Sequence, residues 1–199
     1  MKVLAMEDRN WPLGRAEKAA GSAGDFTAWV RQTREGIYAT LVRIVRNESD
    51  AEDLLQDTYL RALDRLDSYR GEGEPEAWLR RIAVRLALNH LRARKLRRFL
   101  PLSPGGEETA PREDPESPQS TSQPDKDALL AQRRERLELL LRKFPAKAQA
   151  AFALRQLEDR PYTEIGALLG CSEATARSLV SRTTARLERE VRQRGWQDD

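Results

Sequence analysis

The sequence predicts an all-α protein of two small helical domains joined by a flexible, acidic, proline-rich linker. Apolar residues recur at three- and four-residue steps on both sides of residues 100–127, and no segment alternates as a strand would. Residues 100–127 hold six of the ten prolines, with seven acidic and two basic residues. A segment of this composition cannot bury enough apolar surface to become ordered, so we expect it to separate two domains.

The N-terminal domain is expected to contain three helices. Residues 1–24 show no helical period, and we expect a disordered arm there. The apolar period predicts a first helix over 25–46 with Asp25 as N-cap. It predicts a second helix over 49–67, beginning at Ser49 with the spacing of a capping box.

The third helix extends from Glu76 to about Phe99 and completes a predicted domain over 25–99. The second predicted domain covers 128–194. Its helices begin near Ala128 and after Pro145, at Pro161, and after Ser172.

The last two of these helices have the pattern of a helix–turn–helix. Gly170 can adopt the left-handed conformation that a sharp turn needs, and Ser172 can cap the helix that follows. From Ala174 to Leu187 that helix has three arginines and no acid. In DNA-binding helix–turn–helix domains the start of the second helix enters the major groove. The alternative is an ordinary helical hairpin with a solvated arginine face.

The third helix is strongly basic. Between Arg80 and Arg98 there are eight basic residues and no acid, a pattern that suits a polyanion such as nucleic acid. Tyr69 and Trp78 lie beside this run, and their rings could stack on unpaired bases. The alternative is that Trp78 belongs to the core and that the arginines are a solvated face.

The second helix is acidic. Between Asn47 and Glu76 there are ten acidic and three basic residues. DNA would avoid such a surface, so it is either a docking surface for a protein or a solvated face.

Several function classes are disfavoured by what the sequence lacks. With one cysteine, Cys171, and one histidine, His90, the chain has no disulfide framework and no ordinary zinc site. The carboxylates at 48–57 have no His or Cys among them, and the glycines at 71–74 are not followed by Lys-Ser/Thr. We therefore expect no catalytic residue, no metal and no cofactor. We expect Cys171 to pack in the core and His90 to be structural or a DNA contact.

No stretch of the sequence approaches the ~18 apolar residues needed to span a membrane. The short apolar start, residues 3–6, does not resemble a signal peptide. We expect a cytoplasmic protein.

Several stretches of the sequence resemble a known family. Residues 48–67, ESDAEDLLQDTYLRALDRLD, and 77–98, AWLRRIAVRLALNHLRARKLRR, are similar to region 2 of bacterial sigma-70 family RNA polymerase sigma factors, in the two-domain extracytoplasmic function (ECF) group. Residues 137–190, which include FPAKAQAAFALRQLEDRPYTEIGALLGCSEATARSLVSRTTARLERE, are similar to region 4. The two matches occur in the family's order.

The resemblance implies a protein that binds core RNA polymerase and directs promoter-specific initiation. It implies docking on the clamp of the largest subunit through Asp53, Leu54, Gln56, Asp57 and Tyr59, with a second contact to the polymerase flap. It implies recognition and opening of the −10 element by Tyr69, Trp78, Arg80, Arg81, Arg85, Asn89, His90 and Arg92. It implies reading of the −35 element by Thr175, Arg177, Ser178, Ser181 and Arg182.

The partners implied are the polymerase, promoter DNA and an anti-sigma factor. The sequence departs from the family pattern at 174–179, which reads Ala-Thr-Ala-Arg-Ser-Leu where Gly-Thr-Val-Lys-Ser-Arg is usual. Arg182 would then replace the missing basic residue.

One alternative function is a stand-alone helix–turn–helix regulator that binds a two-fold site as a dimer. Another is a DNA-processing enzyme with a metal at the acidic cluster, which the missing ligands argue against.

Overall fold

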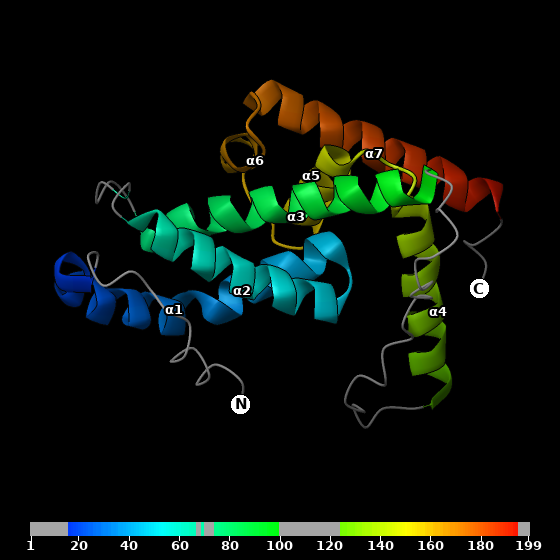
Figure 1. Ribbon diagram of the computed structural model, residues 1–199. Coiled ribbons are helices and arrows are strands. Elements are labelled where there is room, and N and C mark those ends of the chain that lie inside the picture. Colours follow the sequence, from blue (N-terminus) through cyan, green and yellow to red (C-terminus); the bar gives the residue numbers. More distant parts are fainter. Residues whose placement is uncertain (1–15, 67–68, 70–73, 100–123, 195–199) are drawn as a thin grey trace.

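The computed structural model describes residues 16–66, 69, 74–99 and 124–194, and these fold into helices (Figure 1). The prediction of an all-α protein is confirmed, and no strand occurs in the described residues. The helices are α1 (Ala16–Val45), α2 (Glu48–Asp64), α3 (Pro75–Phe99), α4 (Pro124–Leu141), α5 (Ala146–Gln156), α6 (Tyr162–Leu169) and α7 (Glu173–Gln193).

The first three helices pack against one another in every pairwise combination and form the N-terminal unit. Two of their predicted starts are wrong. Helix α1 begins at Ala16, so Asp25 lies inside it and is not its N-cap. The stretch before Asp25 is rich in alanine, the residue with the highest helix propensity, and two glycines do not interrupt it. The part of the expected arm at 1–15 lies outside the described residues.

Two residues separate the end of α1 from the start of α2, and the cap of α2 is Asn47 rather than Ser49. The Asn47 side chain accepts a hydrogen bond from the Asp50 backbone N–H at 2.7 Å. Arg46 makes the sharp corner before it with a φ of 57°. The corner is compact, and it places the acidic start of α2 close to α3.

Helices α4 to α7 form the C-terminal unit. As predicted, Gly170 ends α6 in the left-handed conformation, with φ 60°. As predicted, Ser172 caps α7 by accepting a hydrogen bond from the Thr175 backbone N–H at 3.2 Å. The expected linker ends at 127, but α4 begins at Pro124, a residue that fits the first turn of a helix. Residues 100–123 of the linker lie outside the described residues.

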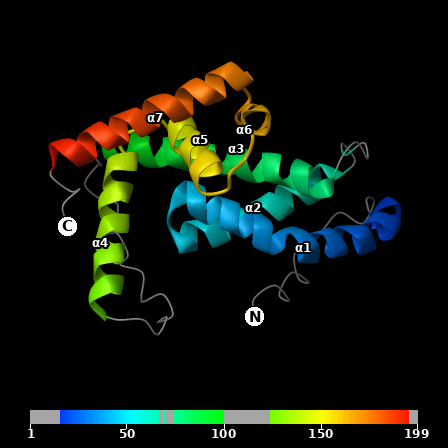
Figure 2. The same cartoon turned by 180° about the vertical axis from the view of Figure 1, so that it is seen from behind.

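The two units pack against each other. Helix α3 lies between the α1–α2 pair and the helices α5 and α6, and α7 covers these from above (Figures 1 and 2). Two separate small cores were expected. Instead, one large apolar cluster runs from α1, with Ile37 and Leu41, through Leu79 of α3 to Leu154 and Ile165 of α5 and α6, and a second, smaller cluster lies among α4, α5 and α7. The basic helix α3 is therefore enclosed on two sides.

Candidate nucleic-acid interface

Helix α3 presents one basic, exposed face to solvent. Arg81, Arg85, Asn89 and Arg92 follow one another at steps of four, four and three residues, which places them on a single side of the helix, and all four are exposed. The Arg92 guanidinium donates a hydrogen bond to Asn89 Oδ1 at 3.0 Å. The arrangement gives a row of donors suited to the phosphates and base edges of one strand.

Next to the N-terminal end of this face lies a cluster of aromatic rings. The ring centroid of Tyr69 is 5.1 Å from that of Trp29 and 5.3 Å from that of Trp78. All three side chains are half-buried. Rings that are packed on one side and open on the other can take an unpaired base without rearranging the core.

Helix α2 has an exposed acidic face. Asp53, Gln56 and Asp57 are exposed, and Leu60, one turn further, is 46% exposed. These residues lie on one side of the helix because their spacing follows the helical period. A carboxylate pair repels nucleic acid and is complementary to a basic protein surface.

Two glycines, Gly166 and Gly170, permit the tight turn between α6 and α7. The Cys171 backbone N–H donates to the Gly166 carbonyl at 2.9 Å. A Cβ built on Gly166 would lie 2.8 Å from the backbone oxygen of Cys171, so the close approach requires glycine there. Cys171 itself is half-buried and packs against the main apolar cluster, as expected.

The N-terminal half of α7 has one polar, largely exposed face. The Arg177 guanidinium lies 2.8 Å from Glu173 Oε1 and 4.6 Å from the centroid of the Tyr162 ring, which holds it over the start of the helix. Arg182 Nε donates to the Ser178 carbonyl at 3.2 Å. Thr175 and Ser181 are exposed and Ser178 is half-buried. The five side chains form one face opposite the buried Ala176, Val180 and Thr183.

Comparison with known proteins agrees with this geometry. Residues 25–97 match the family described as Sigma-70 region 2, and residues 134–187 match Sigma-70, region 4. The chain is 33% identical over 181 residues to the ECF RNA polymerase sigma factor SigE of Mycolicibacterium smegmatis, a match that covers 89% of this chain and 67% of that protein. It is 30% identical over 173 residues to the RNA polymerase sigma-E factor of Streptomyces coelicolor, a match that covers 86% of this chain and 88% of that protein. The chain belongs to the ECF RNA polymerase sigma factors.

Solved structures share the fold of this sigma factor. The sigma factor RpoE, solved in complex with the anti-sigma factor NepR from Bartonella quintana, superimposes with a TM-score of 0.56 at 22% identity, and the match covers 84% of this chain and 97% of that one. CnrH, solved in complex with the cytosolic domain of CnrY, has a TM-score of 0.56 at 20% identity over 89% of this chain and 94% of that one.

Two residues predicted to contact the −10 element are not on the exposed face of α3. Arg80 is 4% exposed and donates to Thr40 Oγ1 at 2.8 Å, and it forms ion pairs with Glu76 and Glu158. His90 is half-buried, with its Nε2 3.0 Å from Asp50 Oδ2 but not aligned to donate a hydrogen bond. Both side chains are thus directed at acids on neighbouring elements, Arg80 at Glu158 and His90 at Asp50.

Two residues predicted for the polymerase surface also face inward. Leu54 is 7% exposed and belongs to the core. The Tyr59 hydroxyl lies 3.0 Å from Thr33 Oγ1, and its ring packs edge-on against Phe26. Burial raises the pKa of Tyr59 above its ordinary value, and its hydrogen bond to Thr33 opposes the shift.

Sequence reasoning missed three contributors to these surfaces. Leu60 extends the acidic face, and its place one turn after Gln56 and Asp57 was a usable signal. Trp29 joins the aromatic cluster from α1, which nothing local in the sequence indicates. Gly166 permits the tight turn before α7, and a glycine inside an apolar helix was the signal for it.

The part of the chain that the structure describes contains no group of three or more His, Cys, Asp or Glu residues arranged to hold a metal ion. Nor does it contain a helix whose length and apolar character would carry it across a bilayer.

Proposed function

We propose that this sigma factor reads the two promoter elements with the two exposed faces described above, and that α2 docks it on the polymerase. The observation that carries the proposal is the row of Arg81, Arg85, Asn89 and Arg92 on one side of α3, which ends at the half-buried rings of Tyr69 and Trp78. Basic donors beside open aromatic rings match a single strand whose bases are unstacked.

In the proposed −10 contact, the arginines neutralise phosphates and the ring cluster holds one base out of the stack. Unstacking a base costs a few kcal/mol, and it costs least where the duplex is already weak. Arg80 and His90 are left out of the proposed contact because Arg80 is buried in ion pairs and His90 is directed at Asp50. The five exposed or half-exposed residues at the start of α7 form the proposed −35 reader.

The proposed polymerase contact consists of Asp53, Gln56, Asp57 and Leu60 on α2, facing the clamp of the largest subunit. A groove between α4, α5 and α7 is the proposed contact for the flap. Apolar side chains dominate it, and its lining residues are Leu137, Phe152, Thr184, Leu187, Glu188, Val191 and Arg192. Two weak readers held on one polymerase act at high effective concentration, so neither needs high affinity by itself.

We also propose an anti-sigma factor as a partner, since a structural neighbour was solved with one. The cytoplasm is the proposed compartment, because that is where a polymerase subunit acts. The chain is proposed to supply specificity only, with no catalytic residue of its own.

The test is transcription by sigma-free core polymerase with added Arg81→Ala/Arg85→Ala protein, followed by mapping of transcript 5′ ends. Both arginines are exposed, so the variant should fold and bind core normally. The matched control is Arg133→Ala/Arg189→Ala, which removes two exposed arginines from α4 and α7 outside the proposed contacts.

The proposal expects the first variant to lose promoter-dependent starts and the control to keep them. Equal starts from both variants, at the same promoters, would refute the assignment of the −10 contact to this face.

A further inference from the structure

A cavity lies where the end of α3 meets the turn after α4. We call it the seam cavity. Its volume is about 410 Å³ and it is lined by Leu91, Arg94, Lys95, Leu139, Arg142, Lys143 and Gln149. Three of these residues come from the N-terminal unit and four from the C-terminal unit.

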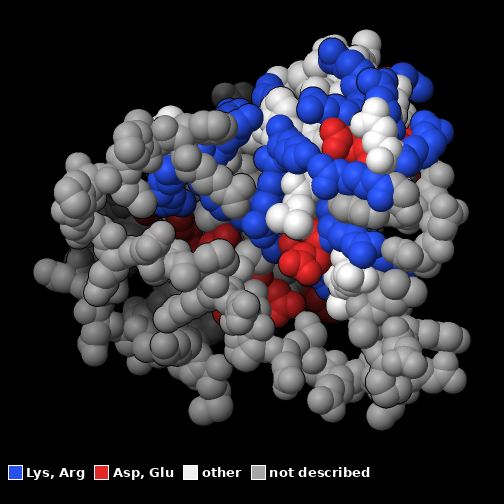
Figure 3. All heavy atoms as spheres, turned by 90° about the vertical axis from the view of Figure 1, so that its right-hand side faces the viewer, with Lys and Arg blue, Asp and Glu red and all other residues white. Residues whose placement is uncertain are grey.

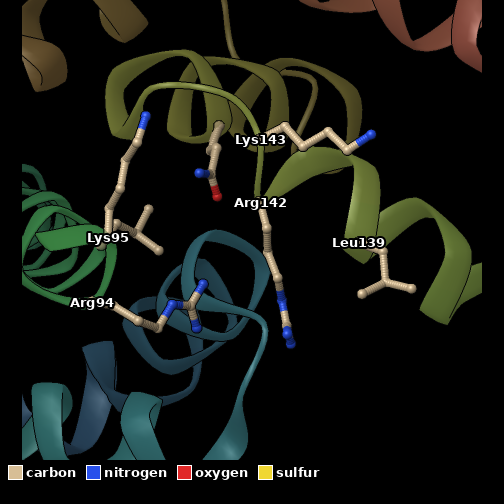
Figure 4. Close-up of a pocket in the computed structure, with 7 residues that line it drawn as sticks. Arg94, Lys95, Leu139, Arg142 and Lys143 are labelled. Atoms are coloured by element: carbon tan, nitrogen blue, oxygen red, sulfur yellow. The ribbon is translucent and has the colours of Figure 1, made fainter. Parts of the chain in front are cut away.

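Four of the seven lining residues are cations. In Figure 4, Arg94 and Lys95 extend from α3 on one side, and Arg142 comes from the turn on the other. Figure 3 views the side of the molecule where α3 and α4 meet, and Lys and Arg gather over the described surface there, with a few acids among them. None of the four lining cations belongs to the proposed promoter or polymerase contacts.

The acids near the seam cavity only partly balance the positive charge of its lining residues. Arg142 Nη2 is 3.9 Å from Glu138, Arg94 Nη1 is 4.0 Å from Asp50, and Lys143 Nζ is 3.6 Å from Glu190. These separations are at the long end of ion pairing, where partly exposed pairs contribute little. Lys95 has no ion pair within the described part of the chain.

A further cation stands behind the cavity wall. Arg46 donates to Gln149 Oε1, and its own Nε is buried without a hydrogen-bond partner. Burial, together with the nearby charges of Arg94 and Arg142, lowers the pKa of Arg46 to about 10, against the opposing effect of Glu138. The protein therefore holds several positive charges close together at a cost that an anion would relieve.

We infer that the seam cavity is a binding site for a compact polyanion with consecutive phosphate groups, such as a linear polyphosphate or the phosphate chain of a nucleotide. Cations on opposing walls suit a ligand with charge along its length, and the cavity exceeds what one phosphate fills. Charge-assisted hydrogen bonds from guanidinium and ammonium groups to phosphate are among the stronger polar contacts. Leu91 and Leu139 give the wall an apolar part that a nucleotide base can cover.

Because its walls come from both units, a bound polyanion connects them. Separation of the units dismantles the site, so by linkage the ligand favours the packed arrangement. The inference does not depend on the proposed promoter contacts, and its test is a binding measurement.

The first experiment titrates the full chain with inorganic tripolyphosphate and, separately, with metal-free ATP, by calorimetry. We expect saturable binding of one molecule per chain that weakens as salt is added. If the two affinities are equal, the site recognises the phosphate chain alone. If ATP binds more tightly than tripolyphosphate, the site also contacts the base. Absence of saturable binding for both probes would overturn the inference.

The second experiment repeats the titration with Lys95→Gln/Arg142→Gln. Affinity should fall about tenfold or more, because two charge-assisted contacts are lost. The control Arg133→Gln/Arg189→Gln removes the same charge from exposed positions outside the cavity and should leave affinity within about twofold. An equal loss in both variants would show attraction to basic surface in general and would overturn the site. Lys95→Gln alone, an exposed residue whose loss breaks no ion pair among the described residues, guards against a folding defect.

The third experiment tests the connection between the units with the substitution Glu158→Gln. Glu158 lies outside the seam cavity and pairs with Arg80 across the same interface. Weaker packing should lower tripolyphosphate affinity. Unchanged affinity would contradict the bridging role.

Discussion

Arg80 of α3 and Glu158, which follows α5, form a buried ion pair between the two units of the molecule. Arg80 Nη1 lies 3.4 Å from Glu158 Oε2, and both side chains are 5% exposed. Arg160 Nε also lies 3.1 Å from the same carboxylate oxygen, and Arg43 Nη1 lies 3.8 Å from the other. A carboxylate of the C-terminal unit thus pairs with a buried arginine of α3, the helix that carries the proposed −10 contact.

Replacing this carboxylate should destabilise the packed molecule. For Glu158→Gln we expect the free energy of unfolding to fall by about 3 kcal/mol, because the buried Arg80 then keeps only Glu76, on its own helix, as a counter-ion. Urea unfolding measures the change. Asp159→Asn, at a side chain 91% exposed, is the control and should have little effect. Equal stability of the two variants would contradict a structural role for the pair.

The turn before α7 allows a comparison of two glycines. Gly166→Ala should cost about 3 kcal/mol, the upper end for overpacking, because the new Cβ meets backbone at Cys171. Gly170→Ala should cost about 1 kcal/mol, because only the left-handed φ is strained and the space around it is open. Thermal unfolding ranks the two. A smaller loss of stability for Gly166→Ala than for Gly170→Ala would show that the backbone of the turn shifts to accommodate the new Cβ.

Tyr59 predicts a pH dependence of stability. Because burial raises its pKa in the folded state, the unfolded chain loses this proton first as pH rises through about 10. The free energy of unfolding therefore falls with pH above that point, and is unaffected by this group below it. Tyr59→Phe should remove this part of the decline. Identical slopes for the two proteins between pH 9 and about 11 would argue against a buried, protonated Tyr59.

The acidic face of α2 predicts a charge-dependent contact. Asp53→Lys/Asp57→Lys should weaken binding to core polymerase and leave the helix content unchanged, since both side chains are exposed. Co-elution with core polymerase measures binding, and circular dichroism checks the fold. Glu35→Lys, an exposed acid on α1, is the control. Retention of full affinity by the folded double variant would remove α2 from the docking surface.

The start of α7 predicts base-specific losses. Arg177→Ala and Arg182→Ala should each weaken dependence on the −35 element by about 1–3 kcal/mol per lost base contact. Transcription from promoters with and without that element measures the dependence. Undiminished dependence in both variants would place the −35 reader elsewhere.

Local patterns predicted the helices well because amphipathic period and caps are local properties. Ser172 and Gly170 act as their residue types suggest. Arg80 could not be placed from sequence, because its partner Glu158 is 78 residues away and no local pattern connects them. For the same reason, the sequence did not indicate that Trp29 joins the aromatic cluster or that Arg46 lies behind the wall of the seam cavity. Leu54 and Tyr59 were assigned by resemblance, and their burial shows that a shared motif includes core positions as well as contacts.

The most direct test of the account adds this protein to sigma-free core RNA polymerase on sheared genomic DNA and maps the transcript 5′ ends. We expect new start sites, absent without the protein, that share two upstream elements, one read by α3 and one by α7. A polymerase that retains the protein on co-elution yet gives no new starts, or starts with no shared element, would contradict it.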